Sequence, residues 1–303
     1  VNLRKLKVKS IPEYYQIRFG KKTRILGAIL LSLGGILNMG LFLQVGAKFV
    51  QYTFGLKTDS SSLIIIMAAL LILVLFYTIF GGMISVIVTD YIQYVVLSIG
   101  FIISVFFSIK YFGWSNIFES IEGLKTYDEI YNPIQTRGIG YISWQVVAGF
   151  VSAVIWPTAI TRALSIKHVS LVRKQYIWSS ISFLIRFIVP CFLGICAFIY
   201  FNVNGNIETN DTLSLFPKYL AAILPSGLLG LVVAGMLAAF MSTHDSYLLC
   251  WSTIITNDII EPLAKKKLSS NKKINISRII IVILGIYIFF WGMFYKGNDE
   301  IWT

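Results

Sequence analysis

Long apolar runs separated by short polar segments dominate the chain. Each run is close to or above the roughly 20 residues that a helix needs to cross a hydrocarbon layer of about 30 Å. The pattern therefore predicts an all-α polytopic membrane protein with about seven transmembrane helices. The predicted spans cover residues 24–50, 63–82, 90–112, 141–161, 176–201, 227–256 and 278–295.

The predicted span 227–256 contains a row of small and hydroxyl-bearing residues. At about 100° per residue, these positions fall on one face of the helix. The row consists of Ala239, Ser242, Thr243, Ser246, Cys250, Thr253 and Asn257. Hydroxyl groups in hydrocarbon need partners, so the row indicates either a seam between helices or the wall of an ion or solute path. His244 is expected on the opposite side, near Tyr247 and Trp251, and is not predicted to be a ligand.

Composition and charge narrow the class of protein. The chain is 56% hydrophobic and 13% charged, with a mean hydropathy of +0.76, which excludes an ordinary soluble domain. Most of the 26 lysine and arginine residues fall on the side of the N-terminal segment, which predicts a multi-pass protein of the plasma (inner) membrane with a cytoplasmic N-terminal end. The net charge of +12 is spread over separate loops. Anionic headgroups are therefore a better partner than nucleic acid, which is not expected.

Three further features interrupt the pattern. Gly81 and Gly82 break the end of the second span, and Asp90 opens the third, where a carboxylate commonly caps a helix N-terminus. Pro157 predicts a bend or unwound turn in the fourth span, which marks either a transporter binding site or a simple proline kink. The three cysteines lie within predicted spans without metal-ligand spacing, so no metal centre, disulfide or organic cofactor is expected.

Four segments resemble successive signatures of the sodium:solute symporter family. They are residues 10–20 (SIPEYYQIRFG), residues 80–93 (FGGMISVIVTDYIQ), residues 161–164 (TRAL) followed by Lys167, and residues 239–246 (AFMSTHDS) with 252–258 (STIITND). The resemblance runs in family order over essentially the whole chain. It implies a five-plus-five inverted-repeat, leucine-transporter-like bundle. Residues 1–303 would form one incomplete transmembrane domain, a fragment similar to core helices three to nine.

The resemblance also implies ion-binding roles. Relatives bind one sodium ion partly through the eighth core helix, whose carbonyl and two hydroxyls match Ala239, Ser242 and Thr243. Asp90 matches an aspartate on the sodium exit path or at a second sodium site. Ser246 fits that second site, whereas Asp245 stands where such members have serine. Asp245 is thus expected to strengthen a cation site, carry a proton or pair with Arg186.

Substrate contacts follow from the broken sixth core helix, which corresponds to the fourth predicted span. Gly149, Ser152 and Trp156 are the candidates there, and Asn38 and Gln44 in the first span are candidates for the same cavity. The side chains that sugar-carrying members place in this region are not matched, which disfavours a sugar.

The resulting prediction is a sodium-coupled secondary active symporter that imports a small organic solute by alternating access, with Na⁺ as the coupling ion. A symporter-like sensor or input domain of a signalling protein is the alternative, to be decided by the sequence beyond Thr303. No enzyme is predicted, because no acid–base or nucleophile arrangement shares a face.

Overall fold

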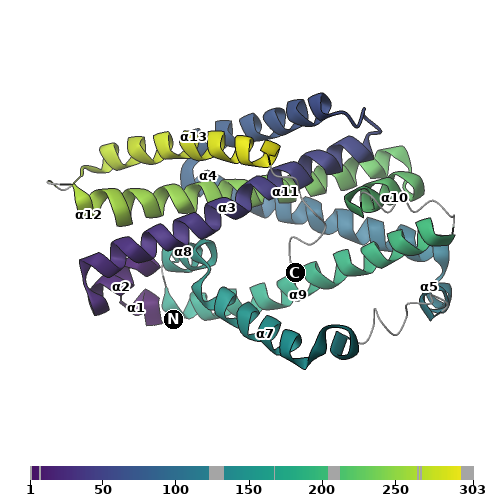
Figure 1. Cartoon of the computed structure of the whole chain (residues 1–303), viewed down its shortest axis with the longest axis horizontal. Helices are drawn as coiled ribbons and strands as arrows, with labels where there is room; N and C mark the ends of the chain where they lie inside the picture. Colours follow the sequence, from purple (N-terminus) through teal and green to yellow (C-terminus); the bar gives the residue numbers. More distant parts are fainter. Residues whose placement is uncertain are drawn as a thin grey trace.

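The computed structural model describes residues 2–6, 8–122, 133–166, 168–203, 212–264, 266 and 268–294, and every regular element in these ranges is helical. Figure 1 shows the arrangement of the long helices. In chain order the elements are α1 (Asn2–Lys5), α2 (Ile11–Phe19), α3 (Lys21–Thr53), α4 (Ser60–Phe112), α5 (Trp114–Glu122), α7 (Pro133–Ile155), α8 (Pro157–Ser165), α9 (Val169–Val203), η1 (Thr212–Ser214), α10 (Leu215–Ile223), α11 (Ser226–Ile254), the π-helix η2 (Ile255–Ile260), α12 (Glu261–Leu263) and α13 (Ser270–Phe294).

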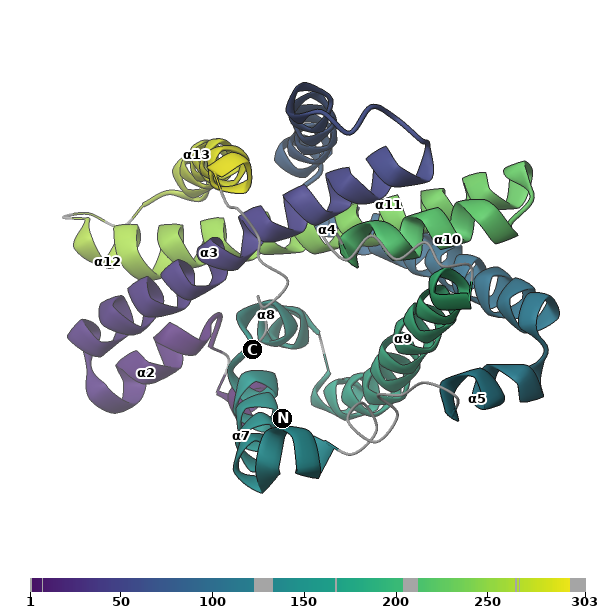
Figure 2. The same ribbon diagram turned by 45° about the vertical axis from the view of Figure 1, so that its right-hand side comes forward.

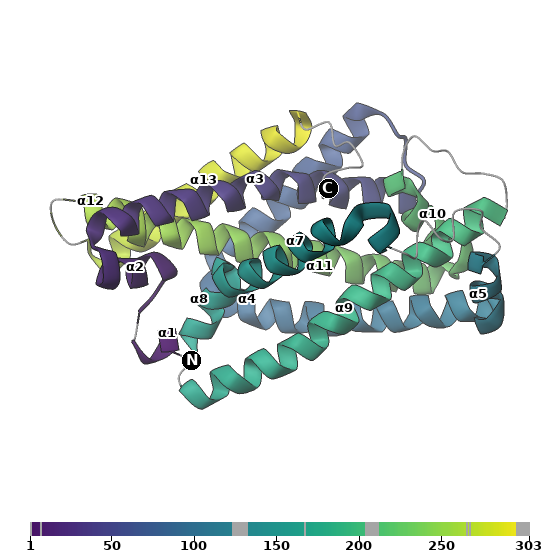
Figure 3. The ribbon, with the colours of Figure 1, turned by 60° about the horizontal axis from the view of Figure 1, so that its bottom comes forward.

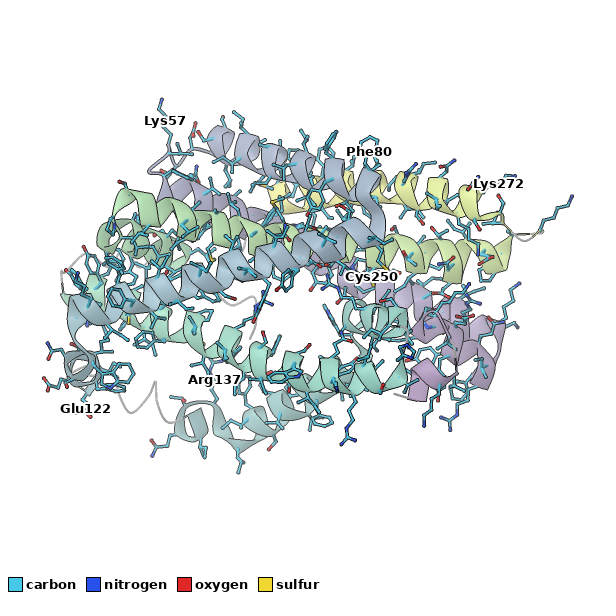
Figure 4. The ribbon with its side chains drawn as sticks, turned by 180° about the vertical axis from the view of Figure 1, so that it is seen from behind. Lys57, Phe80, Glu122, Arg137, Cys250 and Lys272 are labelled. Atoms are coloured by element: carbon cyan, nitrogen blue, oxygen red, sulfur yellow. The ribbon has the colours of Figure 1, made fainter. Side chains whose placement is uncertain are left out.

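Six helical segments of the described chain are long and apolar enough to cross a membrane. One of them, α4, has 53 residues. At 1.5 Å per residue it is about 80 Å long, more than twice the thickness of a hydrocarbon layer. It therefore contains two of the seven predicted spans. Figure 4 shows α4 turning back on itself near Phe80.

The turn in α4 is centred on Gly82, whose φ of 60° and ψ of −165° are not helical. Glycine adopts this conformation readily because it has no β-carbon to clash with the backbone. The helix resumes at Met83, so residues 83–89, expected between two spans, are helical. Asp90 consequently lies inside the helix, and the prediction that it caps a helix N-terminus is wrong.

The helix break before Pro157 is confirmed. Trp156 has an extended backbone, with ψ at 110°, and separates α7 from α8. Proline lacks a backbone donor and disfavours helical geometry in the residue before it. The fourth predicted span is therefore two helical pieces that meet at Trp156.

Helices α3, α11, α13 and the first half of α4 pack around one apolar core. Its fully buried side chains include Met39, Leu43, Met67, Leu248, Trp251 and Ile288. Small residues allow close approach elsewhere along α11, because a β-carbon on Gly235 would lie 3.1 Å from the Cα of Leu97. This group of helices is the most tightly packed side of the molecule, and the functional residues lie next to it.

Helices α7, α8 and α9 lie on the side of the molecule away from α13 (Figures 2 and 3). The apolar side chains of α7 are exposed, with Phe150 at 76%. Most of the apolar side chains in the N-terminal half of α9 are also exposed. Its C-terminal half packs with α10 around Cys196, Ile199, Tyr219 and Leu220. The segment around the helix break is thus much less constrained than α11.

Candidate functional site

The part of the polar row from Ala239 to Thr243 lies in the middle of α11 and borders two cavities. Ala239 and Ser242 line a cavity of 680 Å³, together with Asp90, Arg162 and Arg186. Ala239 and Thr243 line a second cavity of 580 Å³, whose wall includes Phe42, Phe240 and Tyr247. The adjacent residues Ser242 and Thr243 therefore border different cavities, and Ala239 is common to both.

The oxygen atoms of this row are linked along the helix. The hydroxyl of Thr243 donates to the Ala239 carbonyl at 2.9 Å, and the hydroxyl of Ser246 lies 2.7 Å from the Ser242 carbonyl. Neutral oxygens of this kind can replace part of the hydration shell of an alkali cation without binding it too tightly. The three residues predicted to bind sodium are thus adjacent to one another and to open space.

A second group of polar side chains lies one turn further along α11. Arg162, from α8, donates hydrogen bonds to the Asp90 carboxylate on α4 and to the Ser246 hydroxyl on α11. The Arg162 side chain is 37% exposed and that of Asp90 is 11% exposed. The structure therefore brings Asp90 and Ser246 together, and a guanidinium group lies between them.

Asp245 belongs to the same network and is fully buried. Its Oδ2 accepts a hydrogen bond of 2.7 Å from the hydroxyl of Tyr77, and its Oδ1 lies 3.0 Å from the hydroxyl of Ser246. Arg186 lies over the ring of Tyr94, 5.7 Å from its centre, and is not the partner that the sequence suggested for Asp245. The network contains two carboxyl groups, Asp90 and Asp245, but one guanidinium group.

The predicted solute-binding residues are dispersed. Gly149 and Ser152 are exposed on α7 and do not line either cavity. Trp156 is half-buried, and its ring centre lies 6.0 Å from that of Tyr247 in an edge-on contact. Gln44 is half-buried on α3 outside both cavities, and the side chain of Asn38 lies outside the described residues. Trp156 is therefore the candidate that the structure brings into contact with α11.

Two residues of the site, Arg162 and Tyr77, were not predicted from the sequence. Arg162 carried a signal, because it is a basic residue in a recognised motif directly after the broken span. Tyr77 carried none, because it is one aromatic residue in a long apolar run. His244, expected near Tyr247, lines the same cavity as Tyr247 and Thr243, and its Nδ1 lies 3.1 Å from the Phe240 carbonyl.

The helices, the interrupted spans and the buried polar network define a multi-pass integral membrane protein. The family model of the Sodium:solute symporter family matches residues 1–302, and the chain belongs to that family. This is a family of transporters and not of enzymes.

The chain is similar to three sodium-coupled bacterial transporters. It is 25% identical over 311 residues to the sodium/sialic acid symporter SiaT of Proteus mirabilis (strain HI4320), covering 98% of this chain and 60% of that protein. It is 24% identical to the sodium/proline symporter of Escherichia coli (strain K12) over 294 residues, covering 91% and 55%. The sodium/glucose cotransporter of Vibrio parahaemolyticus is 24% identical over 304 residues, covering 90% and 54%.

A solved structure shows the same fold. It is described as the substrate-bound outward-open state of a Na⁺-coupled sialic acid symporter, and it matches with a TM-score of 0.79 and 21% identity over 95% of this chain and 62% of that chain. The predicted leucine-transporter-like bundle is thus confirmed. The chain spans little more than half the length of the relatives it matches.

Proposed function

We propose that the protein containing this chain is a sodium-coupled secondary active symporter that imports a small organic solute by alternating access. The observation that carries the proposal is the set of oxygens at Ala239, Ser242 and Thr243, which borders two cavities in the middle of a membrane-spanning helix. Its relatives that couple sodium to sialic acid, proline and glucose support the assignment.

The proposed sodium site uses the Ala239 carbonyl and the hydroxyls of Ser242 and Thr243. These three groups belong to one turn of α11, which is packed firmly against α3, α4 and α13. A fixed helix keeps the oxygens in place, while the remaining ligands come from elements that move during the cycle. Sodium binding can then favour one conformation, because its ligands are complete in one state and separated in the other.

The Asp90, Asp245 and Ser246 network is proposed as the sodium exit path. Asp90 borders the same cavity as Ser242, so a cation that leaves the proposed sodium site can reach this carboxylate. Arg162 already compensates the charge of Asp90 in this conformation. A second sodium ion would have to displace the guanidinium group, so release past Asp90 is proposed in preference to stable binding there.

The solute is proposed to bind beside the break at Trp156, where unwound backbone offers hydrogen-bonding groups to a ligand. Trp156 contacts Tyr247, which lines the cavity next to Thr243. Coupling between the two ligands is then a free energy shared between adjacent sites. One Na⁺ moving through 100 mV with a tenfold concentration ratio provides about 3.7 kcal/mol, enough for accumulation of several hundred-fold.

The distribution of positive charge supports a plasma (inner) membrane location with the N-terminal end in the cytoplasm. Residues 1–303 are proposed to form part of a single transmembrane domain, equivalent to core helices three to nine.

Uptake by proteoliposomes that contain the full-length protein tests the function directly. A panel of labelled amino acids, carboxylates, vitamins and sugars is offered with an inward Na⁺ gradient and with an equal K⁺ gradient. We expect accumulation of at least one non-sugar solute that depends on Na⁺ and collapses when the gradient is dissipated. Uptake that is equal in Na⁺ and K⁺ for every transported solute would contradict sodium coupling.

A further inference from the structure

A basic cavity lies where α4 turns and α13 begins, away from the proposed sodium site. It has a volume of 610 Å³, and three cationic side chains, Lys9, Lys273 and Arg278, are among its lining residues. Thr78, Thr253 and Ser277 add hydroxyl groups to the same wall. Cations and hydroxyl donors that converge on one cavity are the groups that recognise a phosphate.

Several of these donors are available to a ligand. The hydroxyl of Thr78 is buried without a hydrogen-bond partner among the described residues, and Thr78 itself is 1% exposed. Arg278 uses its Nε to donate to the Ile79 carbonyl at 3.2 Å, which orients the guanidinium group and leaves its terminal nitrogens for an anion. The buried hydroxyl and the oriented arginine point to a ligand that supplies several acceptor oxygens.

The charge balance of the cavity favours an anion. Lys273 forms an ion pair of 2.6 Å with Glu261, so one of the three cations is already compensated. The side chain of Lys9 forms no ion pair in the described part of the chain, while its backbone N–H donates to the Glu13 carboxylate at 2.5 Å. The 25-residue helix α13 also begins at this wall with Ser270, and a helix N-terminus attracts negative charge.

Apolar surface beside the cavity identifies the source of the phosphate. Phe80, Met83 and Ile274 line the cavity and are 70%, 38% and 51% exposed. Figure 4 shows Phe80 at the bend of α4, next to α13. A soluble phosphate ion gains nothing from such side chains, whereas acyl chains can pack on them.

We propose that this cavity is a binding site for the phosphate of an anionic membrane lipid. Arg278 and Lys9 contact the phosphate oxygens, and the acyl chains lie along Phe80, Met83 and Ile274. Basic pockets between membrane helices on the cytoplasmic side bind lipid headgroups in this way. The inference is independent of the solute and of sodium coupling.

Native mass spectrometry of the purified full-length protein tests the site. Dissociation constants are measured for phosphatidylglycerol and for phosphatidylcholine with the same acyl chains. We expect phosphatidylglycerol to bind more tightly than phosphatidylcholine. Arg278→Gln should raise the dissociation constant for phosphatidylglycerol about tenfold, because the variant loses charged hydrogen bonds to the phosphate. Lys9→Gln should weaken it in the same direction, and melting temperatures without lipid check that both variants are folded.

Two further variants separate a built site from general surface charge. Lys272→Gln removes the same charge from the first turn of α13, at a residue that does not line the cavity, and should leave the affinity unchanged. Glu261→Gln frees Lys273 from its ion pair and should strengthen binding. An equal loss in Lys272→Gln and Arg278→Gln, or no preference for phosphatidylglycerol, would overturn the proposal. If inorganic phosphate binds with a dissociation constant as low as that of phosphatidylglycerol, the ligand is free phosphate and not a lipid.

Discussion

The hydroxyl of Tyr77 lies 2.7 Å from Oδ2 of Asp245 and 3.1 Å from the Met241 carbonyl. This contact joins the first half of α4 to α11 in the middle of the bundle. Asp245 is fully buried, so its carboxyl group has no access to bulk water in this conformation. Tyr77 therefore provides part of the solvation that water would otherwise supply.

Replacing Tyr77 with phenylalanine should destabilise the protein by about 1–3 kcal/mol, because a buried acceptor loses its donor. Denaturation in detergent measures the change. Tyr111→Phe is the control, because Tyr111 is 56% exposed and the loss of an exposed hydroxyl should change stability by less than about 0.5 kcal/mol. In the Asp245→Ala background the Tyr77→Phe change should cost much less, and additive effects of the two changes would contradict the assignment.

Ser242→Ala and Thr243→Ala should each raise the sodium concentration needed for half-maximal uptake. Loss of one oxygen ligand from a buried site should raise this sodium concentration about fivefold or more, by analogy with the loss of a buried hydrogen-bonding group. Solute affinity at saturating sodium should change far less. Ser252→Ala is the matched control, because Ser252 is buried on the same helix and bonds the Leu249 carbonyl without lining either cavity. Unchanged sodium dependence in both test variants would count against the proposed site.

Arg162→Gln should lower stability by removing the cation that compensates Asp90. We expect about 1–2 kcal/mol instead of the larger cost of a fully buried pair, because the Arg162 side chain is 37% exposed to solvent. Adding Asp90→Asn should restore part of the loss, since no uncompensated carboxylate then remains. Thermal unfolding of the two single variants and the double variant gives the coupling energy, and a coupling of zero would rule out the ion pair as a stabilising contact.

The spans and their interruptions could be predicted because each depends on local sequence. Apolar runs set the length of each helix, Pro157 set the break at Trp156, and Gly82 set the turn in α4. The boundary at residue 90 was wrong because residues 83–89 (MISVIVT) are mostly apolar and already belong to the second helical half of α4, which begins directly after the turn at Gly82. The hydroxyl of Thr89 bonds the Ser85 carbonyl at 3.1 Å, which allows a polar residue to remain in a membrane helix.

The contacts of the polar network could not be predicted in the same way. Asp90, Arg162 and Ser246 come from three different helices, and helical periodicity says which face a residue occupies but not which distant residue meets it. The resemblance to a family placed Ser246 and Asp90 near each other but left out Arg162. Tyr77 was hidden because its single hydroxyl does not disturb an apolar pattern.

Arg24 and Asp258 form a buried ion pair between α3 and the π-helix at the end of α11. Arg24 Nη2 lies 2.7 Å from Asp258 Oδ1, and the two side chains are 14% and 0% exposed. The guanidinium group also donates to Gln16 at 2.6 Å and to the Asn257 carbonyl at 2.9 Å. This pair ties the start of α3, and through Gln16 also α2, to the end of α11.

Asp258→Asn should therefore destabilise the protein by about 3–5 kcal/mol, because it leaves a buried guanidinium group without its counter-charge. Glu261→Gln breaks a partly exposed ion pair only three residues away and should cost less than about 1 kcal/mol. Chemical denaturation in detergent compares the two. Equal losses would show that burial does not decide the contribution of these pairs.

Gly34 and Gly35 are adjacent on α3 but face different surroundings, and the same substitution should have opposite effects at the two positions. A β-carbon on Gly35 would lie 1.9 Å from Cζ2 of Trp251, whose side chain is 1% exposed and has no room to move. At Gly34 the same atom meets nothing within 4 Å. We expect Gly35→Ala to destabilise by about 1–3 kcal/mol through overpacking and Gly34→Ala to stabilise by up to about 1 kcal/mol through helix propensity. Thermal unfolding of both variants measures these changes, and Trp251→Phe in the Gly35→Ala background should recover part of the loss because the smaller ring leaves space for the new methyl group.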